Sequence, residues 1–222
     1  MIGKLILAVV MGYLIGSIPF GLLFGRFRAR VDIRNYGSGR TGSTNVLRTM
    51  GKGAFLTVAA LDVFKGTAAV LMARLIFGSG YIGIGLYQLK YPAVLALVGM
   101  ATVIGHIWPV FAHFRGGRGV GTYIGTLFAI CPVAALFGGE VLIIVAGLSG
   151  FASLGSLTGI IAAYAMLIPL TFLYGSPIEY LFYAMAGVAL ITIVHRDNIV
   201  RLVNGRERKL NQKAEIRTGS PA

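Results

Sequence analysis

Three polar segments interrupt an otherwise apolar chain, and their residue types suit the binding of an anion. They cover residues 37–48, residues 115–122 and residues 195–209. Glycine lets backbone N–H groups approach a ligand closely, arginine offers a planar fork to phosphate oxygens, and serine, threonine and asparagine add neutral donors. The pattern therefore predicts a phosphate site that is built from several loops.

The first segment combines a glycine-rich turn with the start of a short helix. Three glycines lie within residues 37–42, and Ser43 or Thr44 can cap a helix that carries Asn45 and Arg48. Because these last two side chains are three residues apart, they share a helix face and can reach the same ligand. A helix start also attracts anions, which favours a binding role over a purely topological one.

The second segment opens another helix with a run of glycines around Arg118. Free N–H groups at a helix start, with a guanidinium beside them, can neutralise a phosphate. The segment lacks the GxxxxGK[ST] pattern of a Walker A loop, and no strand precedes it as a dinucleotide fingerprint requires. A simple turn at the inner membrane face is the alternative interpretation.

The third segment places His195, Asn198 and Arg201 at three-residue spacing, so they would line one side of a short interfacial helix. Asp197 and Arg201 could merely form a surface ion pair. The basic residues that follow could bind anionic lipid headgroups. The segment is thus either part of the site or an anchor at the membrane surface.

The composition is that of an integral membrane protein. The 222 residues are 56% hydrophobic and only 12% charged, with a mean hydropathy of +0.81. The net charge of +13 would suggest nucleic acid in a soluble protein, but sixteen of the twenty lysines and arginines fall in residues 26–52, residues 115–118 and the chain after His195. The positive-inside rule assigns these stretches to the cytoplasmic face, so we expect membrane lipids and no nucleic acid as partners.

The apolar segments predict an all-α, polytopic membrane helix bundle of about seven transmembrane or partly spanning helices. The N-terminus is expected outside and the C-terminus in the cytoplasm, and residues 78–90 form a nearly uncharged outer loop. An even number of crossings must join the second and third polar segments, so we split one apolar block at Cys131 and Pro132. The expected segments are 2–24, 53–77, 91–113, a short shielded helix at 120–131, then 132–148, 153–174 and 177–194.

A five-span bundle with re-entrant pieces is the alternative architecture. In either case we expect a single membrane domain over residues 1–210 and a disordered cytoplasmic tail over residues 211–222. Within the spans, Asp62 and Lys65 should face the bundle interior, as a mutual ion pair or towards a polar cavity. His106 is either a proton-transfer group or a hydrogen-bonded interfacial histidine. No metal-ligand cluster is apparent, and no cofactor is expected.

These motifs, in this order, resemble those of the bacterial acyl-phosphate:glycerol-3-phosphate acyltransferase family of integral membrane proteins. The family motif SGNxGxxNxxR is matched by residues 38–48, a second motif ending in GGKGVAT by residues 105–122, and HRxNIxRLLxGxE by residues 195–207. Residues 62–66 are similar to the family's DxxKG, and residues 153–156 to its SLxS turn.

Two departures from the family pattern matter for phosphate binding. Arg40 stands where the family has asparagine, and Arg118 where it has lysine. Both changes keep hydrogen-bond donors, but a planar guanidinium fork presents them differently from a point charge.

The resemblance implies transfer of a fatty acyl group from acyl phosphate to the 1-hydroxyl of glycerol 3-phosphate, giving lysophosphatidate and phosphate, the first step of phospholipid synthesis. It implies a multi-pass protein of the bacterial inner membrane with its active site towards the cytoplasm. The mixed anhydride is already activated, so positioning and charge neutralisation could suffice without an enzyme nucleophile. Either the substrate phosphate or His195 could take the proton. The catalytic candidates are His195, Asn198, Ser38 and Arg48, and the phosphate-binding candidates are Ser38, Gly39, Asn45, Arg48, Gly116, Gly117, Arg118, Gly119, Lys65 and Ser153.

Two other classes compete with this interpretation. A small anion or phosphometabolite transporter could also contain glycine-rich broken helices and charges within its spans. The paired inverted repeats and midplane site expected of a carrier are not visible in the sequence. A lipid-binding scaffold would explain the basic tail but not the glycine-, serine- and asparagine-containing loop.

Overall fold

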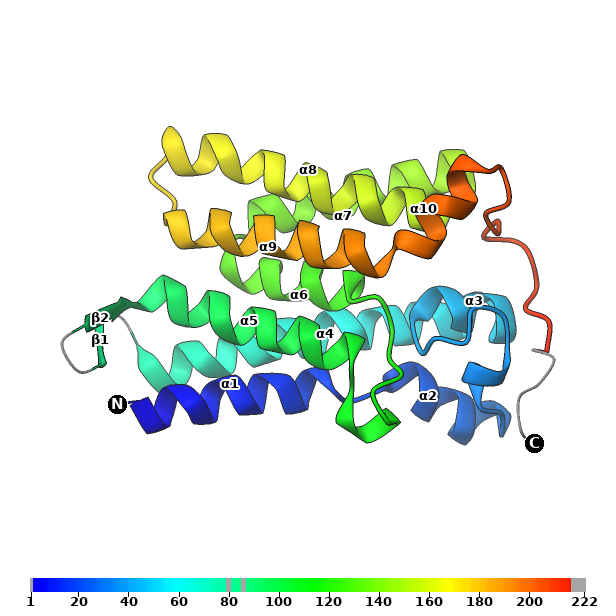
Figure 1. Cartoon of the computed structure of the whole chain (residues 1–222), viewed down its shortest axis with the longest axis horizontal. Coiled ribbons are helices and arrows are strands. Elements are labelled where there is room, and N and C mark those ends of the chain that lie inside the picture. The colour runs from blue at the N-terminus through cyan, green and yellow to red at the C-terminus, as the bar shows by residue number, and fades with distance from the viewer. Residues whose placement is uncertain (1, 79–80, 85–86, 217–222) are drawn as a thin grey trace.

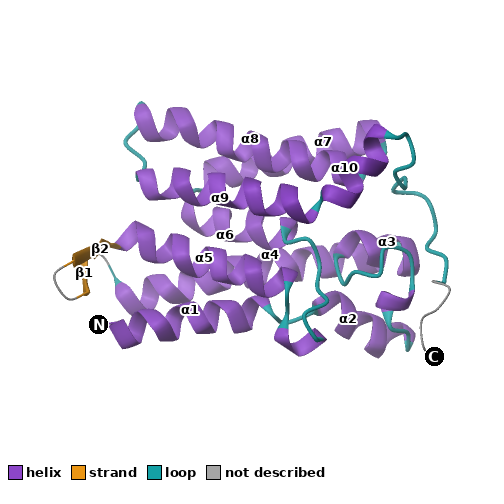
Figure 2. Cartoon of the chain, in the orientation of Figure 1, coloured by secondary structure: helices purple, strands orange, loops and turns teal. Residues whose placement is uncertain are grey.

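A computed structural model describes residues 2–78, 81–84 and 87–216, and this part of the chain is mainly helical (Figure 2). The long helices lie side by side along one axis (Figure 1). The α-helices are α1 (Ile2–Gly16), α2 (Phe20–Phe24), α3 (Ser43–Met50), α4 (Lys52–Phe77), α5 (Tyr91–Ile107), α6 (Val120–Ile130), α7 (Pro132–Ser149), α8 (Ala152–Phe172), α9 (Ile178–Val194) and α10 (Arg196–Val203). The short turns of other helix types are η1 (Gly25–Ala29), η2 (Ile33–Asn35) and η3 (Val110–Ala112).

The outer loop expected over residues 78–90 contains a small antiparallel hairpin instead. Strands β1 (Tyr81–Ile84) and β2 (Tyr87–Lys90) pair in a register that sets Tyr81 opposite Lys90. The hairpin extends beyond the helices at the end of the bundle that also holds the N-terminus (Figure 1). The polar segments gather towards the opposite end.

The first predicted span is broken where the sequence suggested a continuous helix over residues 2–24. Helix α1 ends at Gly16 and α2 begins at Phe20. Pro19 removes one backbone donor and disfavours helix in the residue before it, which accounts for the break. The carbonyl of Ile18, left without a helical partner, accepts a hydrogen bond of 2.9 Å from Nζ of Lys65. The buried Lys65 thus supplies a hydrogen-bond donor to the backbone where the span is broken.

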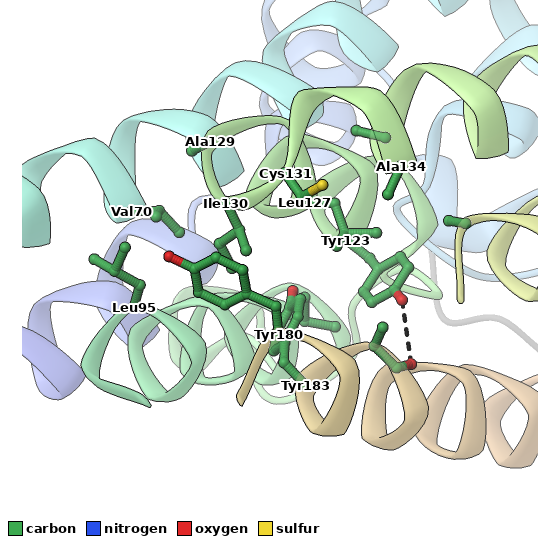
Figure 3. Packing of buried hydrophobic residues seen from close by; sticks show 14 of the residues in the cluster. Val70, Leu95, Tyr123, Leu127, Ala129, Ile130, Cys131, Ala134, Tyr180 and Tyr183 are labelled. Carbon is green, nitrogen blue, oxygen red and sulfur yellow. Dashed lines mark hydrogen bonds between the residues drawn. The ribbon is translucent and has the colours of Figure 1, made fainter. Parts of the chain in front are cut away.

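The predicted division at Cys131 and Pro132 is confirmed. Helix α6 ends at Ile130, and α7 begins at Pro132. Because α6 has only 11 residues, it cannot cross a bilayer alone, and it is packed among α4, α5, α7, α8 and α9. Figure 3 shows its Tyr123 and Leu127 in the apolar core, with the Tyr123 hydroxyl donating to the carbonyl of Ala184 over 3.2 Å.

The described residues contain five helical segments that are long and apolar enough to cross a membrane, so the protein is multi-pass. These segments are Ile2–Ala29, Lys52–Phe77, Tyr91–Ala112, Pro132–Ser149 and Ala152–Phe172. Helix α9 would be a sixth if it is counted together with α10, from which it is bent by 64°. With the short α6, the segments that the sequence predicted to span or partly span the membrane are all helical.

The chain after α10 runs back along the bundle end to the first polar segment (Figure 1). The N–H of Leu210 donates to the carbonyl of Gly150, that of Ala214 to Arg48, and that of Gly37 to Glu215. Within the tail that the sequence predicted to be disordered, residues 211–216 thus include backbone groups with hydrogen-bond partners. Residues 217–222 of the expected tail lie outside the described residues.

Candidate active site

The three polar segments contribute to a single pocket at the end of the bundle near the chain's C-terminal part. Its cavity volume is about 70 Å³, enough for a few water-sized groups, such as the atoms of a phosphate. It is lined by Ser38, Arg40, Gly42, Ser43, Thr44, Asn45, Arg48, Asp62, His106, Gly117, Arg118, Gly119, Val120, Gly121, Ala152, Ser153, Ser156 and His195. The sequence predicted a composite pocket of this kind.

Three helix starts meet at this pocket. The first turns of α3, α6 and α8 supply Ser43, Val120 and Ala152 to its lining. The first N–H groups of a helix have no intrahelical acceptor, and the helix dipole adds partial positive charge there. Three such ends around one small cavity give it the donors and the positive potential that suit an anion.

Three arginines add full positive charge to the same pocket. Arg40, Arg48 and Arg118 all line it, and Nη1 of Arg40 also donates to the carbonyl of Gly117 over 3.4 Å. Burial, and then the charge of Arg40, lower the pKa of Arg118 to about 10. The Nε of Arg118 is buried and has no hydrogen-bond partner among the residues that the structure describes. An anionic ligand would relieve both the repulsion and the missing hydrogen bond.

The side-chain amide of Asn45 binds the protein backbone and not, as the sequence predicted, the ligand. Its Nδ2 donates to the carbonyls of Ile33, Tyr36 and Arg40 at 2.8–3.1 Å, and its Oδ1 accepts the N–H of Ser38 at 3.1 Å. With its amide fully engaged and 2% exposed, it holds the first loop in shape. The prediction that Asn45 donates to the ligand is therefore not supported by this geometry.

Arg48 joins the first segment to the third. Its Nε donates to the carbonyl of Lys209 at 3.1 Å, and its Nη2 donates to that of Arg208 at 2.7 Å. Burial, followed by the charge of Arg208, lowers the pKa of Arg48. The side chain thus lines the pocket while two of its nitrogens hold the tail.

Glu207 organises much of the third segment, a role that the sequence did not predict. Its Oε1 accepts hydrogen bonds from Ser153 at 3.0 Å and from Asn198 at 2.7 Å, and its Oε2 pairs with Arg201 at 2.8 Å. The suggested pair between Asp197 and Arg201 is therefore wrong. Asp197 lies near Arg196 instead, at 3.7 Å.

The two ring nitrogens of His195 have different roles: Nδ1 contacts the backbone, and Nε2 remains for a ligand in the pocket. Its Nδ1 lies 2.8 Å from the carbonyl of Ile191, and a carbonyl only accepts, so Nδ1 carries the proton. Burial, and then the charge of Arg118, lower the pKa of His195 to about 4. In the neutral ring Nε2 is consequently a hydrogen-bond acceptor, suited to an incoming hydroxyl.

The inner wall of the pocket is a buried polar cluster that reaches into the spans. Asp62 pairs with Lys65 at 2.8 Å, which is the mutual ion pair that the sequence left open. Asp62 also lies 3.4 Å from Nδ1 of His106, which contacts the Thr122 hydroxyl at 3.1 Å. Behind the second loop, a Cβ added at Gly117 would collide with Nε2 of His106, so only glycine fits there.

The structure separates the predicted site residues into two groups. Ser38, Asn45, Arg48, Gly117, Arg118, Gly119, Ser153 and His195 line the pocket. The other four lie outside its lining, namely Gly39, Gly116, Lys65 and Asn198. Gly116 instead supports the first loop, because its carbonyl accepts the N–H of Thr41 at 3.4 Å. Asp62 and His106 also line the pocket. The sequence left open a polar cavity beside Asp62 and a proton-transfer role for His106, but neither residue was among the site candidates.

The fold and the site define a multi-pass membrane protein with an arginine-lined pocket at one end of its helix bundle. Within the described residues, no group of three or more histidine, cysteine, aspartate or glutamate side chains could hold a metal ion. The chain belongs to the glycerol-3-phosphate acyltransferase family, whose profile matches residues 6–205. The resemblance of its motifs to this family is thereby confirmed, and the chain is an acyltransferase.

Similar proteins cover nearly the whole chain. Glycerol-3-phosphate acyltransferase 3 of Dehalococcoides mccartyi is 60% identical over 96% of this chain and 99% of its own length. The glycerol-3-phosphate acyltransferase of Shouchella clausii is 40% identical with the same coverage. A crystal structure of PlsY (YgiH), an integral membrane glycerol 3-phosphate acyltransferase in its glycerol 3-phosphate form, is 38% identical, covers 92% of this chain and 94% of that chain, and has a TM-score of 0.79. Its lysophosphatidic acid form has a TM-score of 0.77 at 36% identity.

Proposed function

We propose that this chain transfers a fatty acyl group from acyl phosphate to the 1-hydroxyl of sn-glycerol 3-phosphate at the cytoplasmic face of a bacterial inner membrane. The single observation that carries the proposal is the pocket formed by three helix starts and three arginines, which matches phosphate in charge and size. The two similar crystal structures are described as a glycerol 3-phosphate form and a lysophosphatidic acid form, which supports the same chemistry.

Both substrates carry a phosphate, so the pocket must handle more than one anionic group. Arg40, Arg48 and Arg118 supply three positive charges, and the helix starts add neutral N–H donors. A cavity of about 70 Å³ takes headgroup atoms only. The acyl chain therefore lies outside it, along the apolar surface of the helices.

In the proposed reaction, the 1-hydroxyl oxygen attacks the carbonyl carbon of acyl phosphate, a C–O ester bond forms, and the bond to phosphate breaks. The developing charge falls on the phosphate and carbonyl oxygens, where arginines and helix starts stabilise it. Nε2 of His195 accepts a hydrogen bond from the attacking hydroxyl and orients it. With a pKa of about 4, His195 is a weaker base than the phosphate, so the departing phosphate takes the proton.

The other predicted residues take revised parts in this proposal. Ser38, Gly117, Gly119 and Arg118 contact phosphate oxygens directly, and Arg48 does so while holding the tail. Asn198 acts through Glu207, because its amide donates to that carboxylate and lies outside the pocket lining. Asn198 is thus a positioning residue and His195 the catalytic one.

The test is to reconstitute the purified protein in lipid vesicles, supply acyl phosphate and glycerol 3-phosphate, and measure lysophosphatidate by mass spectrometry. We expect equal amounts of lysophosphatidate and phosphate to form. His195→Gln is the matched inactive control, and Arg115→Gln, an exposed arginine outside the pocket, is the matched active control. Activity with acyl-CoA alone would contradict the donor. Uptake of glycerol 3-phosphate into vesicles without acylation would favour a transporter.

A further inference from the structure

Glu140 has no evident place in the proposed reaction, and its position is unusual. It is the ninth of the 18 residues of α7, about 13 Å from the Ser149 end of the helix, and therefore near the bilayer centre. It is exposed, between Leu136 (63% exposed) and Ile144 (50% exposed) on the same helix face. Glu140 has no hydrogen bond or ion pair with any residue that the structure describes.

A carboxyl group at this depth needs a polar partner or a proton, because hydrocarbon solvates neither its charge nor its hydrogen-bonding groups. Ionisable side chains within spans normally face the bundle interior, as Asp62 and Lys65 do here. Glu140 instead faces a side of α7 that no helix among the described residues covers. A partner on this side would supply the hydrogen bonds that hydrocarbon does not.

The spacing along that side is the spacing of a helix–helix contact. Val133, Phe137, Glu140, Ile144 and Gly147 follow one another at intervals of four, three, four and three residues, and all five are exposed. This interval is that of the seam of a left-handed helix pair, in which one polar residue sets the register.

A second helix could approach the seam closely, because α7 lies at the edge of the bundle. Its main neighbours within the chain are α8 and α6. A Cβ added at Gly147 would meet nothing within 4 Å, so a second helix could come near the backbone there.

We propose that this seam, defined by the five residues from Val133 to Gly147 named above, is the contact between two copies of this chain in the membrane. All copies insert with the same topology, so a two-fold axis along the membrane normal makes the two α7 helices parallel. Equivalent residues then meet at equal depth, and Glu140 faces Glu140 of the second copy. One protonated carboxyl donates to the other carboxylate, which supplies both groups with a partner.

The charge pattern favours a second copy over an unrelated partner. The seam contains no lysine, arginine or histidine, and a carboxyl group is self-complementary once one proton is shared. A different membrane protein would have to bring a basic side chain to the same depth, which is costly for that protein before assembly.

Cysteine cross-linking in vesicles tests the contact directly. In a Cys131→Ala background, which removes the chain's only cysteine, Ile144→Cys lies on the seam. The matched control is Ile161→Cys on α8, because Ile161 is also 50% exposed and lies near the middle of its helix. We expect oxidation to cross-link the Ile144→Cys protein at least tenfold faster. Equal rates would overturn the proposal.

Single-molecule photobleaching in the same vesicles tests the role of Glu140. We expect two-step bleaching for the native chain and for Glu140→Gln, which keeps a donor and an acceptor, and one-step bleaching for Glu140→Leu. The acyl-transfer assay reports whether Glu140→Leu is folded, since the residue is outside the pocket. A native chain that bleaches in one step, or a Glu140→Leu chain that stays paired, would overturn the proposal. Native mass spectrometry that finds a different membrane protein bound at this face would also do so.

Discussion

The side-chain amide of Asn198 donates a hydrogen bond of 2.7 Å to Oε1 of Glu207, and this contact connects the last helix to the tail. The same carboxylate accepts from Ser153 and pairs with Arg201, and its own side chain is 4% exposed. Three side chains from two helices, α8 and α10, therefore depend on one buried carboxylate.

Replacement of this carboxylate should weaken both stability and activity. Glu207→Ala leaves several donors unpaired, each at a cost of about 1–3 kcal/mol, so we expect a lower unfolding temperature and an activity loss of at least about tenfold. Fluorescence of Trp108, the only tryptophan, can follow thermal unfolding in detergent. The control is Glu215→Ala, because Glu215 is exposed and contacts the first loop through its backbone. An unchanged unfolding temperature for Glu207→Ala would contradict this role.

Arg118 should determine the affinity for a phosphate substrate. A hydrogen bond to a charged group contributes about 1.5–3 kcal/mol, so Arg118→Gln should raise KM about 10- to 100-fold while the protein stays folded. Arg118→Lys keeps the charge and should lose less. Because the pKa of Arg118 is lowered to about 10, the native KM should also begin to rise as the pH increases towards 10. Steady-state kinetics measure these KM values, with Arg115→Gln as the control. If Arg118→Gln has the same KM as the native protein and the Arg115→Gln control, Arg118 does not determine the affinity for the phosphate substrate.

Gly117 should tolerate no side chain. In Gly117→Ala the new Cβ collides with the imidazole of His106, so either the ring or the second loop must move, and we expect activity to fall at least about tenfold. Gly53→Ala is the matched control, because a Cβ at Gly53 meets nothing within 4 Å. There we expect native activity and slightly higher stability, since alanine favours helix. Full activity of Gly117→Ala would show that the loop adapts.

The buried ion pair between Asp62 and Lys65 should contribute to the stability of the fold. Asp62→Asn leaves the ammonium of Lys65 unpaired, which costs about 3–5 kcal/mol for a buried pair. Adding Lys65→Met should restore much of this loss, because no buried charge then remains. Thermal unfolding of both single variants and the double variant measures the coupling. If the double variant is no more stable than Asp62→Asn, the pair is not the source of the loss.

The neutral state of His195 should be detectable by NMR of protein labelled with ¹⁵N-histidine. With its pKa lowered to about 4, the ring should stay neutral, with the proton on Nδ1, down to about pH 5. The unfolded chain binds a proton near pH 6.5, so this residue's contribution to stability is complete above that pH and decreases as the pH falls towards 4. Arg118→Gln should raise the pKa by removing a repulsive charge. A native His195 that titrates near pH 6.5 would contradict the buried environment.

The sequence determined the elements and the composite nature of the site. Charge segregation predicted that the three polar segments lie at one membrane face, and the motif order predicted that they form one pocket, which they all line. Pro132 divided α6 from α7 as observed. These features are local. A proline removes a backbone donor, a glycine permits a close approach, and the length of an apolar run indicates whether it can cross the membrane. They depend little on the rest of the chain.

Only the tertiary structure decided which polar groups bind a ligand and which bind the protein. Asn45 and Asn198 look alike in the sequence, because each lies three residues before an arginine. In the structure, both amides donate to carbonyl or carboxylate groups of the chain. Lys65 similarly satisfies Ile18 and Asp62. A buried donor takes the nearest available acceptor, and the nearest acceptor belongs to a segment far away in the sequence, so its identity follows from packing and not from spacing.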